Sequence, residues 1–89
     1  MTNIPAIYQG KLNTLDQIKI SPLSRAYTFS DSIYEVIPYF LGKPLCFQQH
    51  IDRMVESAKL SGLDLDFQLV SVEMKELAKT LVGQDGYVY

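Results

Sequence analysis

The stretch HIDRMVESAK, residues 50–59, carries the side chains whose types and spacing are best suited to chemistry. In a helix successive residues turn by about 100°, so His50, Arg53 and Ser57 share one sector beside an apolar stripe. Residues three apart on a helix are neighbours, with Cβ atoms about 5–6 Å apart. Two basic side chains and a hydroxyl in one sector are suited to bind a phosphate or a carboxylate.

A structural role for this sector is the competing interpretation. An arginine often lays its methylene groups on an apolar stripe and keeps its guanidinium in water, and a single histidine is usually a satisfied structural group. Glu35 matters here because it lies between Ile33 and Ile37 on one face of the segment IYEVIPYF. A partly buried carboxylate needs a donor, and His50 or Arg53 on a covering helix supplies one. A structural ion pair and an anion site therefore stay open as alternatives.

The composition of the 89-residue chain argues against several other classes of function. Its formal net charge is −2 and it has no run of Lys or Arg, so it lacks the basic footprint of a nucleic-acid-binding protein. No apolar stretch approaches the ~20 residues that span a bilayer, and we see no signal peptide. One Cys and one His cannot supply a zinc site, and we expect no metal. A single cysteine fits a reducing, cytoplasmic location.

The strands that position these residues follow from the hydrophobic pattern. AIYQGKL predicts a short strand pair around Gly10, or an edge strand, and SRAYTFSDS predicts a structured loop. Residues 33–40 are rich in β-branched and aromatic side chains and predict a strand. With the turn at 41–43 and the segment PLCF, they predict a hairpin over 33–47. Pro38 cannot donate a ladder hydrogen bond, so its position must face an edge, a bulge or another irregularity.

Two helices complete the pattern. The first is expected over about 48–61, ending at Gly62, and the second over about 68–82. The final YVY is expected to begin a strand. We predict a single α+β domain with a mainly antiparallel sheet and two helices packed on one face, with the N-terminal strand, the hairpin and YVY all in that sheet. Strand 33–40 carries bulky groups on both faces, so the face without helices needs a second domain, a second subunit or a ligand.

Residues 24–65 carry a series of motifs that together resemble the N-terminal domain of the fold-type IV pyridoxal-phosphate enzymes. This family comprises D-amino-acid transaminases, branched-chain aminotransferases and aminodeoxychorismate lyases. Its pattern is roughly D-R-G-x-x-F-G-D-G-V-[YF]-E, a strand, N-G-K, a strand, and H-x-x-R-[LM]-x-x-S-A. The chain matches it as Ser24-Arg25-Ala26, Phe29-Ser30-Asp31-Ser32, Ile33-Tyr34-Glu35, Leu41-Gly42-Lys43, and His50 through Ala58.

The resemblance implies a role for each candidate residue. Arg53 matches the arginine that holds the cofactor phosphate, and Glu35 and His50 match a supporting network that orients this arginine. Tyr34 matches a residue that faces the substrate carboxylate. The run Y-E-V-I is closer to D-amino-acid transaminases than to branched-chain enzymes. The implied activity is a pyridoxal-phosphate-dependent exchange of amino groups between amino acids and 2-oxo acids, with D-alanine as the foremost substrate.

The chain also departs from the family pattern. Ala26, Ser30 and Ser32 replace family glycines, and Pro38 stands where a basic residue is common. The family's Schiff-base lysine lies far beyond this domain. The lysines of this chain, none of which matches it, are Lys11, Lys19, Lys43, Lys59, Lys75 and Lys79.

These departures shape what the resemblance implies for the chain itself. We expect residues 1–89 to be one N-terminal domain of a larger two-domain enzyme. Alone it should have no catalytic residue, no activity and no bound cofactor, and it should form a homodimer or otherwise self-associate. Branched-chain aminotransferase and aminodeoxychorismate lyase are the alternatives within the family. A non-catalytic dimerisation or interaction module is the alternative from another class.

Overall fold

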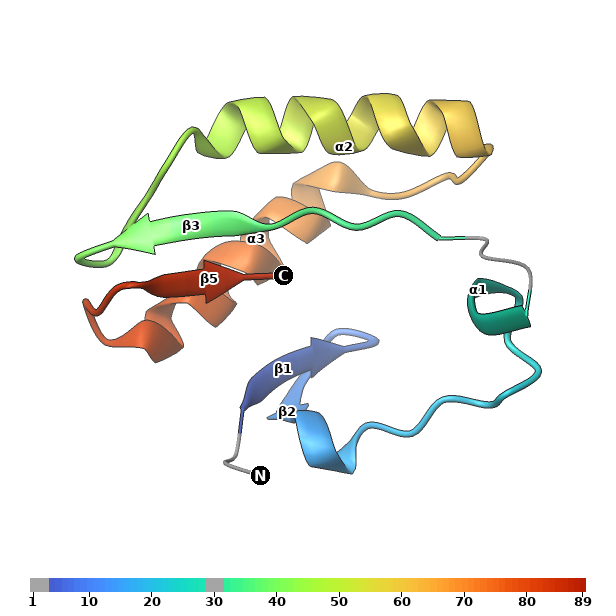
Figure 1. The fold of residues 1–89 in the computed structure, drawn as a ribbon, viewed down its shortest axis with the longest axis horizontal. Coiled ribbons are helices and arrows are strands. Elements are labelled where there is room, and N and C mark those ends of the chain that lie inside the picture. Colours follow the sequence, from blue (N-terminus) through green and yellow to red (C-terminus); the bar gives the residue numbers. More distant parts are fainter. Residues whose placement is uncertain (1–3, 29–31) are drawn as a thin grey trace.

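The computed structural model describes residues 4–28 and 32–89, and its architecture is α+β (Figure 1). Two antiparallel sheets pack with two long helices, which confirms the predicted fold class. The prediction that all the strands belong to one sheet is wrong. The N-terminal strands form a sheet of their own, because a groove lined mainly by apolar side chains separates them from the larger sheet.

The N-terminal sheet is a hairpin of β1 (Pro5–Tyr8) and β2 (Lys11–Thr14). Gln9 and Gly10 form its turn, and both have positive φ, 50° and 81° respectively. This is the backbone conformation that a two-residue type I′ turn requires, since its twist matches that of the flanking strands. The strand pair predicted around Gly10 is therefore confirmed. A 3-10 turn at Leu15–Gln17 follows β2.

The larger sheet has three strands in the order β4 (Lys43–Pro44), β3 (Ile37–Phe40) and β5 (Gly86–Val88). The predicted hairpin and the predicted final strand are thus both present. The carbonyl of Pro38 accepts a hydrogen bond from the Leu45 N–H at 2.9 Å, just beyond the end of β4. The return bond would need the N–H that proline lacks. Pro38 therefore lies where the ladder between β3 and β4 stops, which is the irregularity that its presence predicted.

The strand predicted over 33–40 is shorter than expected, since only its second half is β3. Residues 33–36 belong to no strand. The reason is a lack of partners. The β5 ladder stops at the pair Ile37–Val88, and β4 is too short to reach back along β3. Side-chain type favours a strand here, but a strand needs a neighbour to bond.

The loop predicted for SRAYTFSDS contains a short helix, α1 (Arg25–Thr28), so that prediction is wrong at these residues. The turn closes on the Ser24 carbonyl, which accepts hydrogen bonds from the Thr28 N–H at 2.9 Å and from the Thr28 hydroxyl at 3.0 Å. Residues 29–31 of the predicted loop lie outside the described residues.

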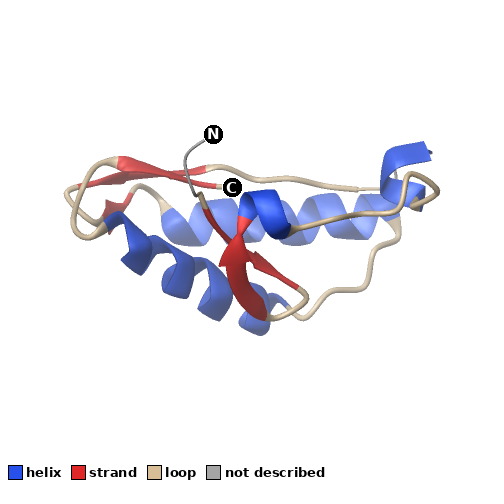
Figure 2. Cartoon of the chain, turned by 90° about the horizontal axis from the view of Figure 1, so that it is seen from below, coloured by secondary structure: helices blue, strands red, loops and turns tan. Residues whose placement is uncertain are grey.

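Two helices cover one face of the larger sheet, as Figure 2 shows. They are α2 (Phe47–Ser61) and α3 (Phe67–Ala78), with α3 continuing as a 3-10 turn over Lys79–Leu81. Gly62 ends α2 with φ 71°, and its N–H bonds the carbonyls of the last helical turn. Both predicted helices and the stop at Gly62 are confirmed. No helix in residues 4–28 and 32–89 is long and apolar enough to cross a membrane.

The core lies between this sheet and the two helices. The buried residues that form it are Ile37, Tyr39, Ile51, Met54, Met74 and Val88. Side chains alternate along a strand, so Phe40 and Tyr87 point to the opposite face, where they are 57% and 63% exposed. Among the described residues, the two helices cover one face of the sheet, and the other face presents exposed aromatic side chains.

The start of α3 provides a direct test of its capping. The Asp66 carboxylate accepts hydrogen bonds from the Gln68 and Leu69 N–H groups at 3.1 and 3.2 Å. We expect Asp66→Ala to lower the free energy of unfolding by about 1 kcal/mol, because two helical N–H groups lose their acceptor. Asp66→Asn, which keeps an accepting oxygen, should retain most of the stability. Urea denaturation measures both, and an unchanged Asp66→Ala midpoint would contradict the assignment.

Candidate functional site

The candidate residues are brought together by α2 and by the segment that leads into β3. His50 and Arg53 lie three residues apart on α2, on neighbouring positions of its surface. Glu35 precedes β3 by two residues and follows the inward alternation of Ile37 and Tyr39. It is 7% exposed, and it is the one buried charged residue among the described residues. The sequence therefore delivers a carboxylate from the sheet layer and two basic groups from the helix layer to one place.

Glu35 accepts hydrogen bonds from both basic side chains. Arg53 Nε donates to Glu35 Oε2 at 3.1 Å, and Arg53 Nη2 donates to Oε1. His50 Nδ1 lies 2.6 Å from the same Oε1. A carboxylate can only accept, so the proton of this contact is on Nδ1 and the histidine is the donor. The expectation that Glu35 takes a donor from the covering helix is confirmed, and both candidate donors fill that role.

The charges of this cluster stabilise one another. The hydrogen bond from Arg53 holds the pKa of Glu35 below its usual value, and the hydrogen bond from His50 acts in the same direction. Burial alone would raise that pKa, but the donors outweigh it. The hydrogen bond to Glu35 in turn raises the pKa of Arg53. The carboxylate and the guanidinium are therefore both ionised at neutral pH.

The two partners differ greatly in exposure. The Glu35 side chain is 4% exposed and that of Arg53 is 67% exposed. Glu35 engages the Nε and Nη2 edge of the guanidinium, and Nη1 has no hydrogen-bond partner within the described part of the chain. A carboxylate rooted in the core thus fixes the plane of the guanidinium and leaves its other edge facing outward.

Arg53 also lines a depression of about 390 Å³ on the surface. The depression is lined by Tyr34, Glu35, Val36, Arg53 and Ser57. A guanidinium edge and a hydroxyl are suitable donors for a phosphate or carboxylate. Glu35 neutralises part of the arginine charge, so we expect these residues alone to hold an anion weakly. The arrangement suits recognition of a charged group.

Tyr34 and Val36 lie at this depression together. Tyr34 is 87% exposed, so the residue proposed from the motifs to meet a substrate stands at the open side of the site. Sequence reasoning did not single out Val36 as a lining residue. The alternation of side chains along extended backbone, which puts positions 34 and 36 on one side, is the signal that identifies it.

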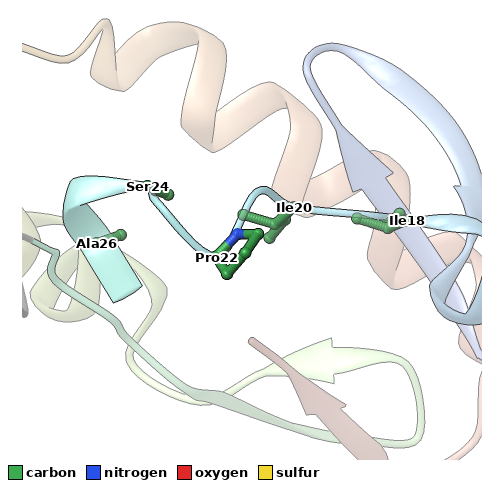
Figure 3. A pocket seen from close by; sticks show the side chains of 5 residues that line it. All are labelled: Ile18, Ile20, Pro22, Ser24 and Ala26. Atoms are coloured by element: carbon green, nitrogen blue, oxygen red, sulfur yellow. The ribbon is translucent and has the colours of Figure 1, made fainter. Parts of the chain in front are cut away.

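A separate cavity of about 510 Å³ follows the connector between the N-terminal hairpin and α1 (Figure 3). Its lining side chains are those of Ile18, Ile20, Pro22, Ser24 and Ala26. None of them carries a charge, so this cavity offers no counter-charge for an anion. Among the described residues, no group of three or more His, Cys, Asp or Glu side chains is arranged to hold a metal ion.

No protein-family model matches the chain. Comparison with individual proteins agrees with the motifs. The D-alanine aminotransferase of Staphylococcus epidermidis is 33% identical over 79 residues, which is 89% of this chain and 27% of that protein. That of Bacillus licheniformis is 31% identical over 85 residues, 93% of this chain and 30% of that protein. That of Staphylococcus aureus is 36% identical over 76 residues, 85% of this chain and 26% of that protein.

These relatives confirm the resemblance drawn from the motifs. The chain has an α+β fold and is similar, over most of its length, to aminotransferases. The particular proteins to which it is similar are D-alanine aminotransferases. The chain spans less than a third of their length.

Proposed function

We propose that this chain is the N-terminal domain of a pyridoxal-phosphate-dependent aminotransferase that acts on D-amino acids, D-alanine above all. The observation that carries the proposal is the Arg53 guanidinium, which a buried carboxylate orients and which is mostly exposed beside a surface depression that Arg53 lines. The similarity to D-alanine aminotransferases over most of the chain supports it. In this proposal the cluster binds the phosphate of the cofactor.

The chemistry of the cluster supports a phosphate as its ligand. Arg53 would donate from its outer edge to the phosphate, and the Ser57 hydroxyl lines the same depression. Glu35 would keep the guanidinium in one plane, and His50 would hold the carboxylate in turn. Such a support shell limits the movement of the group that contacts the ligand. The cofactor, when bound, supplies an electron sink for the carbanion at the substrate Cα.

The rest of the reaction is assigned to protein outside residues 1–89. No lysine of this chain matches the lysine that carries the cofactor in the resembling family, so we propose that another domain provides it. The 89-residue chain alone should then be inactive and retain no cofactor. We also propose that the open aromatic face of the larger sheet is covered by that domain or by the other subunit of a homodimer, that Tyr34 faces the substrate carboxylate, and that the enzyme works in the cytoplasm.

Activity assays of the full-length protein test this proposal. We expect amino transfer from D-alanine to a 2-oxo acid acceptor, dependent on added pyridoxal phosphate, with little transfer from L-leucine. Preference for L-leucine would indicate a branched-chain aminotransferase instead. Pyruvate release from aminodeoxychorismate without a 2-oxo acid acceptor would indicate the lyase.

A non-catalytic dimerisation or interaction module remains the candidate from a different class. The exposed aromatic face of the sheet favours it, since such a face suits a protein partner. Absence of turnover with all three substrates, together with a stable dimer that takes up no pyridoxal phosphate, would support this module and contradict the proposed enzyme.

A further inference from the structure

A groove of about 340 Å³ lies between the two sheets. Its lining includes residues 5–7 of β1 and residues 87–89, which include the end of β5. Figure 1 shows the positions of β1 and β5 in the fold. Leu77 and Leu81 of the α3 segment contribute to its lining. The groove is therefore mainly apolar, and strands that run along it border both of its sides.

The β5 wall presents unpaired backbone groups. The Pro38 carbonyl points toward Leu45, on the β4 side of β3. The neighbours of Pro38 in β3, Ile37 and Tyr39, therefore point their backbone groups toward β5, where they pair with Val88 and Gly86. Backbone groups of successive residues point to opposite sides of a strand. The N–H and C=O of Tyr87 therefore point away from β3, to the edge that has no partner strand in the described residues.

The β1 wall presents matching groups. In a two-residue hairpin the pair that flanks the turn, here Tyr8 and Lys11, is hydrogen-bonded. Hydrogen-bonded pairs alternate with non-bonded pairs along the hairpin, and in that alternation Ile4 and Leu15 form another bonded pair. The Leu15 N–H indeed donates to the Ile4 carbonyl at 2.7 Å. The N–H and C=O of Ile7 therefore point away from β2, and β1 also has no second partner strand among the described residues.

We propose that this groove is the binding site of one extended strand, which the part of the protein outside residues 1–89 supplies. The added strand would join the two sheets into one. A strand has two bonding edges, so a single insertion can bond Ile7 on one side and Tyr87 on the other. Every second side chain of that strand would face the helices, where Leu77 and Leu81 select apolar groups. The occupant is thus a segment with alternating apolar residues.

The rest of the same protein is a better occupant than a second copy of this chain. Pairing of β5 with β5 of another copy would satisfy Tyr87 and leave Ile7 without a partner, whereas an inserted strand satisfies both. The chain also spans only 26% to 30% of the length of its relatives, so a protein of their length has ample further sequence. The inference takes from the proposed function only that a longer polypeptide exists, and it requires neither cofactor nor turnover.

Amide hydrogen exchange of the 89-residue chain and of the full-length protein tests whether a strand occupies the groove. In the 89-residue chain the Ile7 and Tyr87 amides should exchange within a few-fold of the unstructured rate, while Val88 is protected by its bond to β3. In the full-length protein both Ile7 and Tyr87 should slow by at least about 100-fold. Activity need not be measured, so this test can fail while the proposed function stands, and the reverse also holds.

Three outcomes would overturn the proposal. Fast exchange of Ile7 and Tyr87 in the full-length protein would mean that no strand occupies the groove. Slow exchange in the 89-residue chain that strengthens with protein concentration would assign the groove to a second copy. Slow exchange there without concentration dependence would mean that the groove is closed by the chain itself.

A substitution at Ile7 provides an independent measurement in the full-length protein. Ile7→Pro removes an N–H that β2 does not use, so the hairpin can persist while the inserted strand loses its bond and meets the proline ring. Protection at Tyr87 should fall by at least about tenfold, with Val88 unchanged. Ile7→Val is the matched control and should retain protection. Unchanged protection of Tyr87 in a folded Ile7→Pro protein would contradict the inserted strand.

Discussion

Replacing Arg53 with alanine in the full-length protein is expected to weaken its affinity for pyridoxal phosphate by about 10- to 100-fold, since a charge-assisted hydrogen bond is lost. Arg53→Lys should recover part of this loss. A lysine provides a positive charge but not a planar fork with one edge on Glu35 and the other outward. Titration of the cofactor-free enzyme with pyridoxal phosphate, followed by its absorbance, measures the affinity of each variant.

A double substitution separates ligand binding from stability in this experiment. Arg53→Ala also removes donors from Glu35, a carboxylate only 4% exposed, so the single variant combines two defects. Arg53→Ala with Glu35→Gln removes the buried charge and should relieve part of the unfolding while the affinity for the cofactor stays low. If the folded fraction of either variant binds pyridoxal phosphate as the wild type does, Arg53 is a structural residue and the phosphate assignment is wrong.

More of the candidate site than of the sheet arrangement could be predicted from the sequence. The positions of His50 and Arg53 depend on the geometry of one continuous helix, whose length is fixed by an apolar stripe and by Gly62. The need of Glu35 for a donor follows from its neighbours along the chain. These are local relations, and the structure reproduces them. The exposed position of Tyr34 was harder to foresee, because exposure depends on what covers the outer face of the sheet.

The failures concern relations between distant segments. Residues 33–36 have strand-forming side chains but no partner strand among the residues that the structure describes, and sequence composition does not report where a neighbouring strand stops. The division into two sheets has the same cause, since the edges of β1 and β5 are separated by a groove instead of a ladder. The short helix at Arg25–Thr28 depends on hydrogen bonds to Ser24 that compete weakly with other turn conformations.

Glu35 should have the largest effect on stability of any residue in the cluster. Glu35→Ala removes the common acceptor of Arg53 and His50 and leaves a small void beside the core. Arg53 is mostly exposed and can be hydrated, but the His50 side chain is only 16% exposed, so its Nδ1 donor loses a partner where water has little access. We expect the free energy of unfolding at neutral pH to fall by about 1–3 kcal/mol.

The pH dependence identifies the charge as the source of this stability. The pKa of Glu35 is lowered in the folded state, so its ionised form stabilises the fold fully above the unfolded pKa of about 4.3. That contribution is lost as the pH falls through the lower folded pKa. The deficit of Glu35→Ala relative to the wild type should therefore be largest at pH 7 and shrink when urea denaturation is repeated near pH 3.

Glu35→Gln is the matched control, because it keeps the shape of the side chain and loses the charge. Its amide oxygen can replace one carboxylate oxygen as an acceptor, but its NH₂ group faces donors of Arg53 or His50 and cannot accept from them. Its loss at pH 7 should therefore approach that of Glu35→Ala and show the same decrease on acidification. A deficit that is the same at pH 7 and near pH 3, with Glu35→Gln as stable as the wild type, would assign the effect to packing and would remove the electrostatic reason for the orientation of Arg53.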